Sequence, residues 1–459
     1  MANKGVTKLQ YFGAVVVLLL LASLFIIVTA PLEYEKLTML CFFAGGGLLV
    51  FVGKRLKNPR MHSLSVFSGV FVLLTTLLMW NYLFTTMEPA NSAFGLFQND
   101  SESYVRDTLR AITEGRGPET FGLLMHTGEE YAAQLGLHGW AFSLLLNFFS
   151  YGQSIYLLHM FCAMLTAAVF VLLCMLIYRK YNLLMAGCFF ACFWLGQWVV
   201  NFARNLYWIE FSWFVPMLFG LFVSIYGDDR CCRYLGYAGV LVSVILKCMC
   251  GYEYITCIMM AMIAFPLVDW VSALRRGEKK RARTLFVRAF VLGALALLAF
   301  VLTLLIHALV RGGGDLMQGL DLIYRNDVLR RASMNADAAL FDAVYTESLE
   351  ISPIKVLENY FSFPTDIIVG LPGSLFTLLS VLPGIIFVYR GLKKQLDLSE
   401  VVLYLFFFLT SASWFVLAAP HSQTHYHMNY VLWYFGHIQL CMYFVLRQGR
   451  EFLQQRSEK

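Results

Sequence analysis

Long apolar runs separated by short polar segments dominate the pattern of the chain. An apolar run of about 17–25 residues is long enough to cross a bilayer as a helix. Runs of roughly this length are found near residues 10–30, 37–53, 63–86, 154–178, 182–202, 211–226, 233–251, 254–273, 285–310, 371–390, 400–419 and 429–446. This pattern predicts an all-α polytopic membrane protein with about twelve transmembrane helices.

Composition supports the same class. Of the 459 residues, 59% are hydrophobic and only 14% are charged, whereas soluble domains carry about 25% charged residues. The net charge of +6 comes from the loops between the runs, so it does not indicate nucleic-acid binding. The cysteines lie in the apolar runs or in the short loop with Cys231 and Cys232, which predicts no disulfide framework. The first run is followed by "PLEYEK" rather than by a small-residue cleavage site, so we expect a retained helix.

Basic residues cluster in particular loops between the runs. They form "KRLKNPR" (54–60), "YRKY" (178–181), "RRGEKKRAR" (275–283), "YRGLKK" (389–394) and "RQGR" (447–450). The positive-inside rule assigns these segments to the cytoplasm, and both termini then lie inside. The segment "GDDRCCR" (227–233) also falls on the cytoplasmic side, but it supports this assignment least because it is nearly neutral. Two long loops, 87–137 and 311–370, then lie outside, and long ordered loops usually carry function.

The first outside loop contains the acidic segment "QNDSESYVRD" (98–107). Asp100 and Ser101 are residues that commonly cap a helix N-terminus. The residues that follow place Val105, Leu109 and Ile112 on one helical face, so we expect a surface helix of about three turns that ends near 115–117. Such a helix would lie on the membrane with its apolar face down. Asp100 is then either a cap or a functional carboxylate.

The stretch "NDSESYVRDTLRAITEG" resembles the first extracytoplasmic loop of the GT-C superfamily of membrane glycosyltransferases, which take a sugar from a polyprenyl-phosphate carrier. The resemblance implies that Asp100 acts as the catalytic base or helps to hold Mg²⁺ or Mn²⁺, with Glu102 as its partner. It also implies that "QLGLHGW" (134–140) lines the acceptor side. The pocket residues expected from this comparison are Tyr104, Gln134, His138 and Tyr207.

In the GT-C family the acidic loop follows the first helix, whereas here it follows the third. The resemblance therefore implies a single transmembrane domain, 1–459, with two helices added at the N-terminus. Its expected parts are the added helices (1–62), a GT-C-like core with catalytic loop 87–137 (63–310), the second outside loop (311–370) and the C-terminal helices (371–459).

Further polar groups fall in the outside segments. Glu210 follows Arg204 in an aromatic stretch, and the two charges either pair or serve the reaction. In the second case Glu210 is a further catalytic acidic group that holds a metal or orients the acceptor, and Arg204 is a candidate for binding the donor phosphate. Lys247 and Glu253 bracket a turn, and we expect them to form an ion pair, although Lys247 is also placed to contact a lipid phosphate.

Two groups of cations are candidates for binding the donor phosphate. His421, His425 and His427 lie together at the outer end of a helix, where hydrogen-bond donors can stabilise a leaving phosphate. The second long loop carries Arg325 and Arg331, and arginine suits a bidentate grip on phosphate. The same composition also suits a solvated helix face.

The leading hypothesis is an inverting glycosyltransferase in a bacterial inner membrane, with its active site on the extracytoplasmic side. The acceptor is a glycan, a lipid or a protein, and the partners are the lipid-linked donor and the bilayer. A polymerase or ligase of the O-antigen type is the alternative enzyme, because it relies on outer arginines and a histidine. A lipid-linked sugar transporter or flippase is the non-enzymatic alternative, but no internal repeat is found, and the charges lie at the outer boundary.

Overall fold

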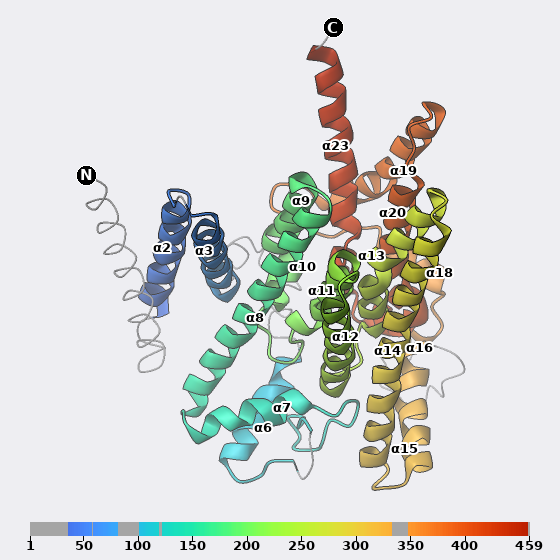
Figure 1. Ribbon diagram of the computed structural model, residues 1–459. Coiled ribbons are helices and arrows are strands. Elements are labelled where there is room, and N and C mark those ends of the chain that lie inside the picture. The colour runs from blue at the N-terminus through green and yellow to red at the C-terminus, as the bar shows by residue number, and fades with distance from the viewer. Residues whose placement is uncertain (1–34, 57, 81–100, 119–121, 333–347, 458–459) are drawn as a thin grey trace, which may run out of the picture.

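The computed structural model describes residues 35–56, 58–80, 101–118, 122–332 and 348–457 (Figure 1). These residues form helices and loops, and their only extended pairings are two isolated bridges, Leu124 with Glu130 and Ile368 with Leu371. The predicted all-α class is therefore confirmed.

Six helical segments of the described chain are long and apolar enough to cross a membrane. They are α8 (Tyr151–Lys180), α12 (Arg230–Cys250), α13 (Ile255–Arg275), α14 (Lys279–Arg311), η4 with α19 (Gly373–Leu375, Phe376–Leu392) and α20 (Leu398–Leu417). Shorter apolar stretches lie in α2 (Glu35–Gly53), α3 (Pro59–Trp80), α9 (Leu183–Leu195) and α11 (Phe211–Tyr226). The chain is thus a helical protein built for a membrane, while the number of twelve spans stays a prediction.

Two predicted spans differ from the structure, and a third is not tested by it. The first, 10–30, lies outside the described residues. The span 182–202 is interrupted at Gly196, between α9 and α10 (Gln197–Phe202). A Cβ at Gly196 would lie 2.6 Å from the Tyr434 ring, so the close packing of this break requires glycine. The span 429–446 begins with the irregular turn η5 (Tyr430–Tyr434), and its regular helix is α23 (His437–Ser457).

Most of the buried apolar side chains form one core that runs from α3 to α23, and a small separate cluster contains Ala273, Ala282 and Leu285. The α2–α3 hairpin stands at the side of the bundle (Figure 1) and packs on α8 through α3. Its two helices approach closely at Gly46 and Gly69, where a Cβ on Gly69 would lie 2.7 Å from the Gly46 carbonyl oxygen.

One end of the bundle, here named the charged end, is joined by ion pairs between helix ends. Lys180 of α8 pairs with Asp269 of α13 at 2.5 Å, and Arg288 of α14 pairs with Asp228 at 2.7 Å. Further pairs join Arg275 to Asp397 and Arg447 to Glu400. Four of the predicted basic segments, those at 178–181, 275–283, 389–394 and 447–450, therefore meet the acidic groups of neighbouring helices at one end.

The opposite end, here named the loop end, carries the short helices (Figure 1). These are α6 (Glu102–Thr113), α7 (Leu137–Ser143), η1 (Leu144–Asn147), α15 (Leu316–Ile323), the π-helical turn η2 (Tyr324–Val328), α16 (Leu329–Ala332), α18 (Pro353–Asn359), α21 (Ala419–Thr424) and α22 (Tyr426–Asn429).

The predicted surface helix exists as α6, but its surroundings differ from the expectation. Val105 and Leu109 are fully buried in the protein core, so this face packs on the bundle rather than on a bilayer. Ser101 occupies the N-cap position with a left-handed φ of 56°, and its side chain makes no capping hydrogen bond. The other predicted cap, Asp100, lies outside the described residues.

Candidate functional site

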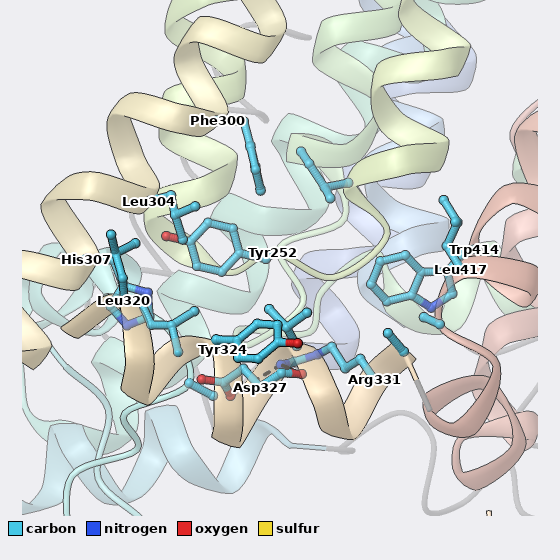
Figure 2. Close-up of a pocket in the computed structure, with 16 residues that line it drawn as sticks. Tyr252, Phe300, Leu304, His307, Leu320, Tyr324, Asp327, Arg331, Trp414 and Leu417 are labelled. Carbon is cyan, nitrogen blue, oxygen red and sulfur yellow. Dashed lines mark hydrogen bonds and ion pairs between the residues drawn. The ribbon is translucent and has the colours of Figure 1, made fainter. Parts of the chain in front are cut away.

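A cavity of about 460 Å³ opens at the loop end between α14, α15, η2 and the end of α20, and is here named the apolar cavity (Figure 2). Its walls are mainly aliphatic and aromatic, with Phe300 and Leu304 from α14, Leu320 from α15, and Trp414 and Leu417 from α20. Sites for small molecules are usually apolar hollows with a few placed polar groups. Here the polar groups are Tyr252, His307, Tyr324, Asp327 and Arg331.

The π-helical turn η2 positions the charged groups of this cavity. Such turns are rare and often occur at functional sites. Asp327 lies in this turn and pairs with Arg311 of α14, and Arg331 one turn later pairs with Asp327 at 3.3 Å and with Glu253 at 3.6 Å. Arg330 lies 3.9 Å from Asp327. Within the described residues, three arginines thus surround the Asp327 carboxylate, and Arg331 also reaches Glu253.

The Arg331 guanidinium stays protonated although it is buried. Burial alone would lower the pKa of its guanidinium, but the Glu253 and Asp327 carboxylates outweigh that effect and raise it. An arginine that stays charged in a partly apolar hollow attracts an anion, and its planar fork matches a phosphate.

The predicted pocket residues come together beside this network. Tyr104 of α6 stacks on Tyr131 with ring centroids 4.6 Å apart, and Tyr207 lies 5.8 Å from Tyr104. His138 of α7 contacts Tyr207 edge-on at 6.1 Å. Burial, and then the charge of Lys247, lowers the pKa of His138 to about 3, so its ring is neutral at neutral pH. Neither ring nitrogen of His138 has a hydrogen-bond partner.

Lys247 and Glu253 do not form the expected pair. The Lys247 Nζ atom donates a hydrogen bond to the Gly251 carbonyl at 2.8 Å, and Glu253 pairs with Arg331 instead. Gly251 adopts φ 152°, and a Cβ there would lie 2.4 Å from both Gln134 Oε1 and Glu253 Oε2. The backbone of this turn therefore touches two side chains of the site directly.

Glu102, predicted as the catalytic partner, is fully engaged in holding the fold. Its carboxylate accepts hydrogen bonds from Arg106 Nε at 2.6 Å, from His159 Nε2 at 2.9 Å and from the Leu206 amide at 3.2 Å. Burial alone would raise the pKa of Glu102, but His159 and Arg106 lower it to about 2. Such a weak base is unsuited to accept a proton at neutral pH.

Glu210, predicted to hold a metal, has the opposite surroundings. It is fully buried, and neither carboxyl oxygen has a hydrogen-bond partner. Burial raises its pKa well above the usual value. In the described residues, no group of three or more His, Cys, Asp or Glu side chains is placed to hold a metal. Its predicted partner Asp100 lies outside the described residues, so the metal role of Glu210 stays a prediction.

The predicted phosphate-binding cations separate into two sets. His421 lies beside the Trp414 ring of the apolar cavity, and its ring centroid is 4.5 Å from that of His425. Burial, followed by the charges of His425, Arg331 and Arg330, lowers the pKa of His421 well below its usual range. Arg331 and His421 therefore belong to the same region.

The remaining predicted residues lie elsewhere. Arg204 Nη1 donates to the Met79 carbonyl at 3.0 Å, which ties α3 to the loop before α11. Arg325 is exposed and pairs with Asp321 at 2.8 Å. Neither arginine lines the apolar cavity. Asp100, the predicted base, lies outside the described residues.

Four polar residues of the apolar cavity were missed in the sequence: Tyr252, His307, Tyr324 and Asp327. His307 lies near the end of a long apolar run, and an ionisable group in such a run is a signal of function. Asp327 lies among arginines in "YRNDVLRR", and its position in the cavity depends on the π-helical turn, which the pattern does not reveal.

Comparison with known proteins gives no relative: no family model, no curated protein and no solved structure matches this chain.

Proposed function

We propose that this protein is a membrane glycosyltransferase of the GT-C kind, which moves a sugar from a polyprenyl-phosphate carrier to an acceptor. In this proposal the charged end faces the cytoplasm, and the loop end lies at the extracytoplasmic face. The observation that carries the proposal is the apolar cavity, because its hydrocarbon walls lead directly to the charged Arg331 and its network of arginines and carboxylates. An isoprenoid chain suits the walls, and its phosphate suits Arg331.

The chemistry is a direct displacement. A base removes the proton of the acceptor hydroxyl, and the oxygen attacks the anomeric carbon. The bond between that carbon and the carrier's phosphate oxygen breaks, and the carrier phosphate leaves with the electron pair. Inversion at the anomeric carbon follows. Arg331 stabilises the charge that develops on the phosphate. Asp100 is the candidate base.

The test uses the purified protein in nanodiscs with radiolabelled undecaprenyl-phosphoglucose, -mannose and -galactose, and with membrane extract as the source of acceptor. We expect transfer of the label by the wild-type protein and loss of transfer in Asp100→Asn at unchanged expression. Asp107→Asn is the matched control, because it makes the same change on α6 of the same loop. Full transfer by Asp100→Asn would refute the role of Asp100.

One observation favours the polymerase or ligase alternative. Arg331 lines the apolar cavity, His421 packs on Trp414 of its wall within reach of the Arg331 charge, and that class uses outer arginines and a histidine rather than an acidic base. Loss of activity in Arg331→Lys, with activity kept in Asp100→Asn, would select this alternative. Movement of the lipid-linked sugar across liposomes without any transfer would select the transporter instead.

A further inference from the structure

A second hollow, of about 190 Å³, lies next to the apolar cavity and is here named the loop hollow. Its lining includes Tyr131, Gln134, His307 and Arg311. His307 lines both hollows, so the loop hollow continues from the polar side of the apolar cavity. Its volume is below the roughly 300–1,000 Å³ of sites for drug-sized ligands, and it suits a single small ring.

Two buried side chains of the loop hollow lack hydrogen-bond partners. Gln134 is only 3% exposed, and both its amide nitrogen and its amide oxygen are unpartnered. His307 is equally buried, and its Nδ1 atom is unpartnered. Buried polar groups are nearly always hydrogen-bonded in native proteins, so each exception calls for an explanation. A ligand that bonds to these atoms is such an explanation.

The chemistry of these atoms points to hydroxyl groups. The His307 Nε2 atom lies 3.1 Å from the Ala132 carbonyl oxygen and donates to it, so the neutral ring presents Nδ1 as an acceptor. Gln134 presents one donor group and one acceptor. A sugar hydroxyl both donates and accepts, so it can satisfy either residue. Tyr131, held by its stack on Tyr104, adds an aromatic surface for the C–H groups of a sugar ring.

The charges at the loop hollow argue for an uncharged ring. Arg311 is paired with Asp327, so its guanidinium is already neutralised by a carboxylate. Glu130, the carboxylate of the lining, is exposed to solvent at the edge of the hollow, and the buried unpartnered groups, Gln134 and His307 Nδ1, offer no net charge to a uronic acid or to an amino sugar. The guanidinium that remains for a phosphate is that of Arg331, which lines the apolar cavity rather than the loop hollow.

We infer that the loop hollow holds one neutral hexose, the sugar of the lipid-linked donor, while the apolar cavity holds its isoprenoid chain. This inference rests on the proposed function and moves Gln134 from the acceptor side to the donor side. The carrier phosphate then lies between the two hollows, near His307 and Arg331.

The test compares lipids with and without the sugar. Undecaprenyl phosphate and its glucosyl, mannosyl and galactosyl derivatives are titrated against the full-length protein in nanodiscs, and binding is measured by native mass spectrometry. We expect at least one neutral glycolipid to bind about 10-fold more tightly than undecaprenyl phosphate. Gln134→Leu should remove that 10-fold difference. Gln318→Leu, the same change at an exposed position of α15, should keep it.

The outcomes separate the inference from the proposed function. If undecaprenyl phosphate itself does not bind, the proposed function fails. If it binds and no neutral glycolipid binds more tightly, the inference fails while the proposed function stands. Tighter binding of undecaprenyl-phospho-4-amino-4-deoxyarabinose than of every neutral glycolipid, or an unchanged difference in Gln134→Leu, also overturns the inference.

Discussion

The buried contacts of Glu102 make a quantitative prediction about stability. Glu102→Gln keeps the acceptor for the Leu206 amide but removes the charge that faces Arg106 and His159. A fall of the pKa from 4.5 to about 2 corresponds to about 3 kcal/mol at 1.36 kcal/mol per unit. We therefore expect the variant to lose about 3 kcal/mol of folding free energy at pH 7, which is a fall of about 5 °C in Tm.

The assay is thermal unfolding of the detergent-purified protein, followed by tryptophan fluorescence. Glu114→Gln is the matched control, because Glu114 follows the same helix and its pair with Arg116 is exposed. Exposed pairs contribute only about 0–1 kcal/mol, so the control should unfold close to the wild-type temperature.

The pH dependence follows from the sign of the shift. Because the folded pKa of Glu102 is lowered, its stabilisation is present above pH 4.5 and is lost as the pH falls toward 2. The difference in Tm between the wild type and Glu102→Gln should therefore become smaller as the pH falls from 4.5 toward 2. Equal Tm values for Glu102→Gln and Glu114→Gln at pH 7 would refute the structural role. A loss of transfer without any loss of Tm would instead restore Glu102 as a catalytic candidate.

Three further predictions concern the site. Gly251→Ala should cost about 3 kcal/mol, because φ 152° is strained for alanine and its Cβ would meet two side chains. Gly277→Ala, at φ 72° with no atom near the added Cβ, should cost about 1 kcal/mol. Equal Tm values for the two glycine variants would contradict the close packing at Gly251. Arg331→Met should cost about 3–5 kcal/mol, because it removes the arginine that pairs with the buried Glu253 carboxylate. Arg325→Met should cost under about 1 kcal/mol, and a similar Tm for both arginine variants would place Arg331 outside the buried network. Leu304→Trp should fill the apolar cavity and weaken binding of undecaprenyl phosphate about 10-fold in native mass spectrometry, and unchanged affinity would place the lipid elsewhere.

Much of the architecture could be read from the sequence because apolar length and helix period are local signals. The pattern placed α6 close to its actual bounds from Val105, Leu109 and Ile112. The pattern could not show that this face packs on the bundle, because a bilayer and a protein core both favour apolar side chains. It also joined α9 and α10 into one span, because the break at Gly196 depends on the distant Tyr434 ring.

The site was predictable as a region but not as a set of partners. Gln134, His138 and Tyr207 were chosen from two separate segments, and the structure brings them near Lys247 and Arg331. The expected pairing of Lys247 with Glu253 was wrong, because a carbonyl four residues away satisfies the lysine, and an arginine from another loop reaches the glutamate. Which ion pair or hydrogen bond forms depends on which of several possible partners the fold brings close, and the sequence pattern does not show this.

The two buried glutamates show why residue type alone does not identify a base. Glu102 and Glu210 are both buried, yet partners lower the pKa of Glu102 to about 2, whereas Glu210 has no hydrogen-bond partner among the described residues and burial raises its pKa. A general base works best when its pKa lies near the working pH, and the pKa values of these two carboxyl groups are shifted in opposite directions by their surroundings. Of the three acidic residues predicted for catalysis, Asp100 therefore remains the candidate for acid–base chemistry. If Asp100→Asn keeps full transfer, the proton must leave by a route that uses Arg331 and the histidines, and the polymerase or ligase mechanism becomes the stronger explanation.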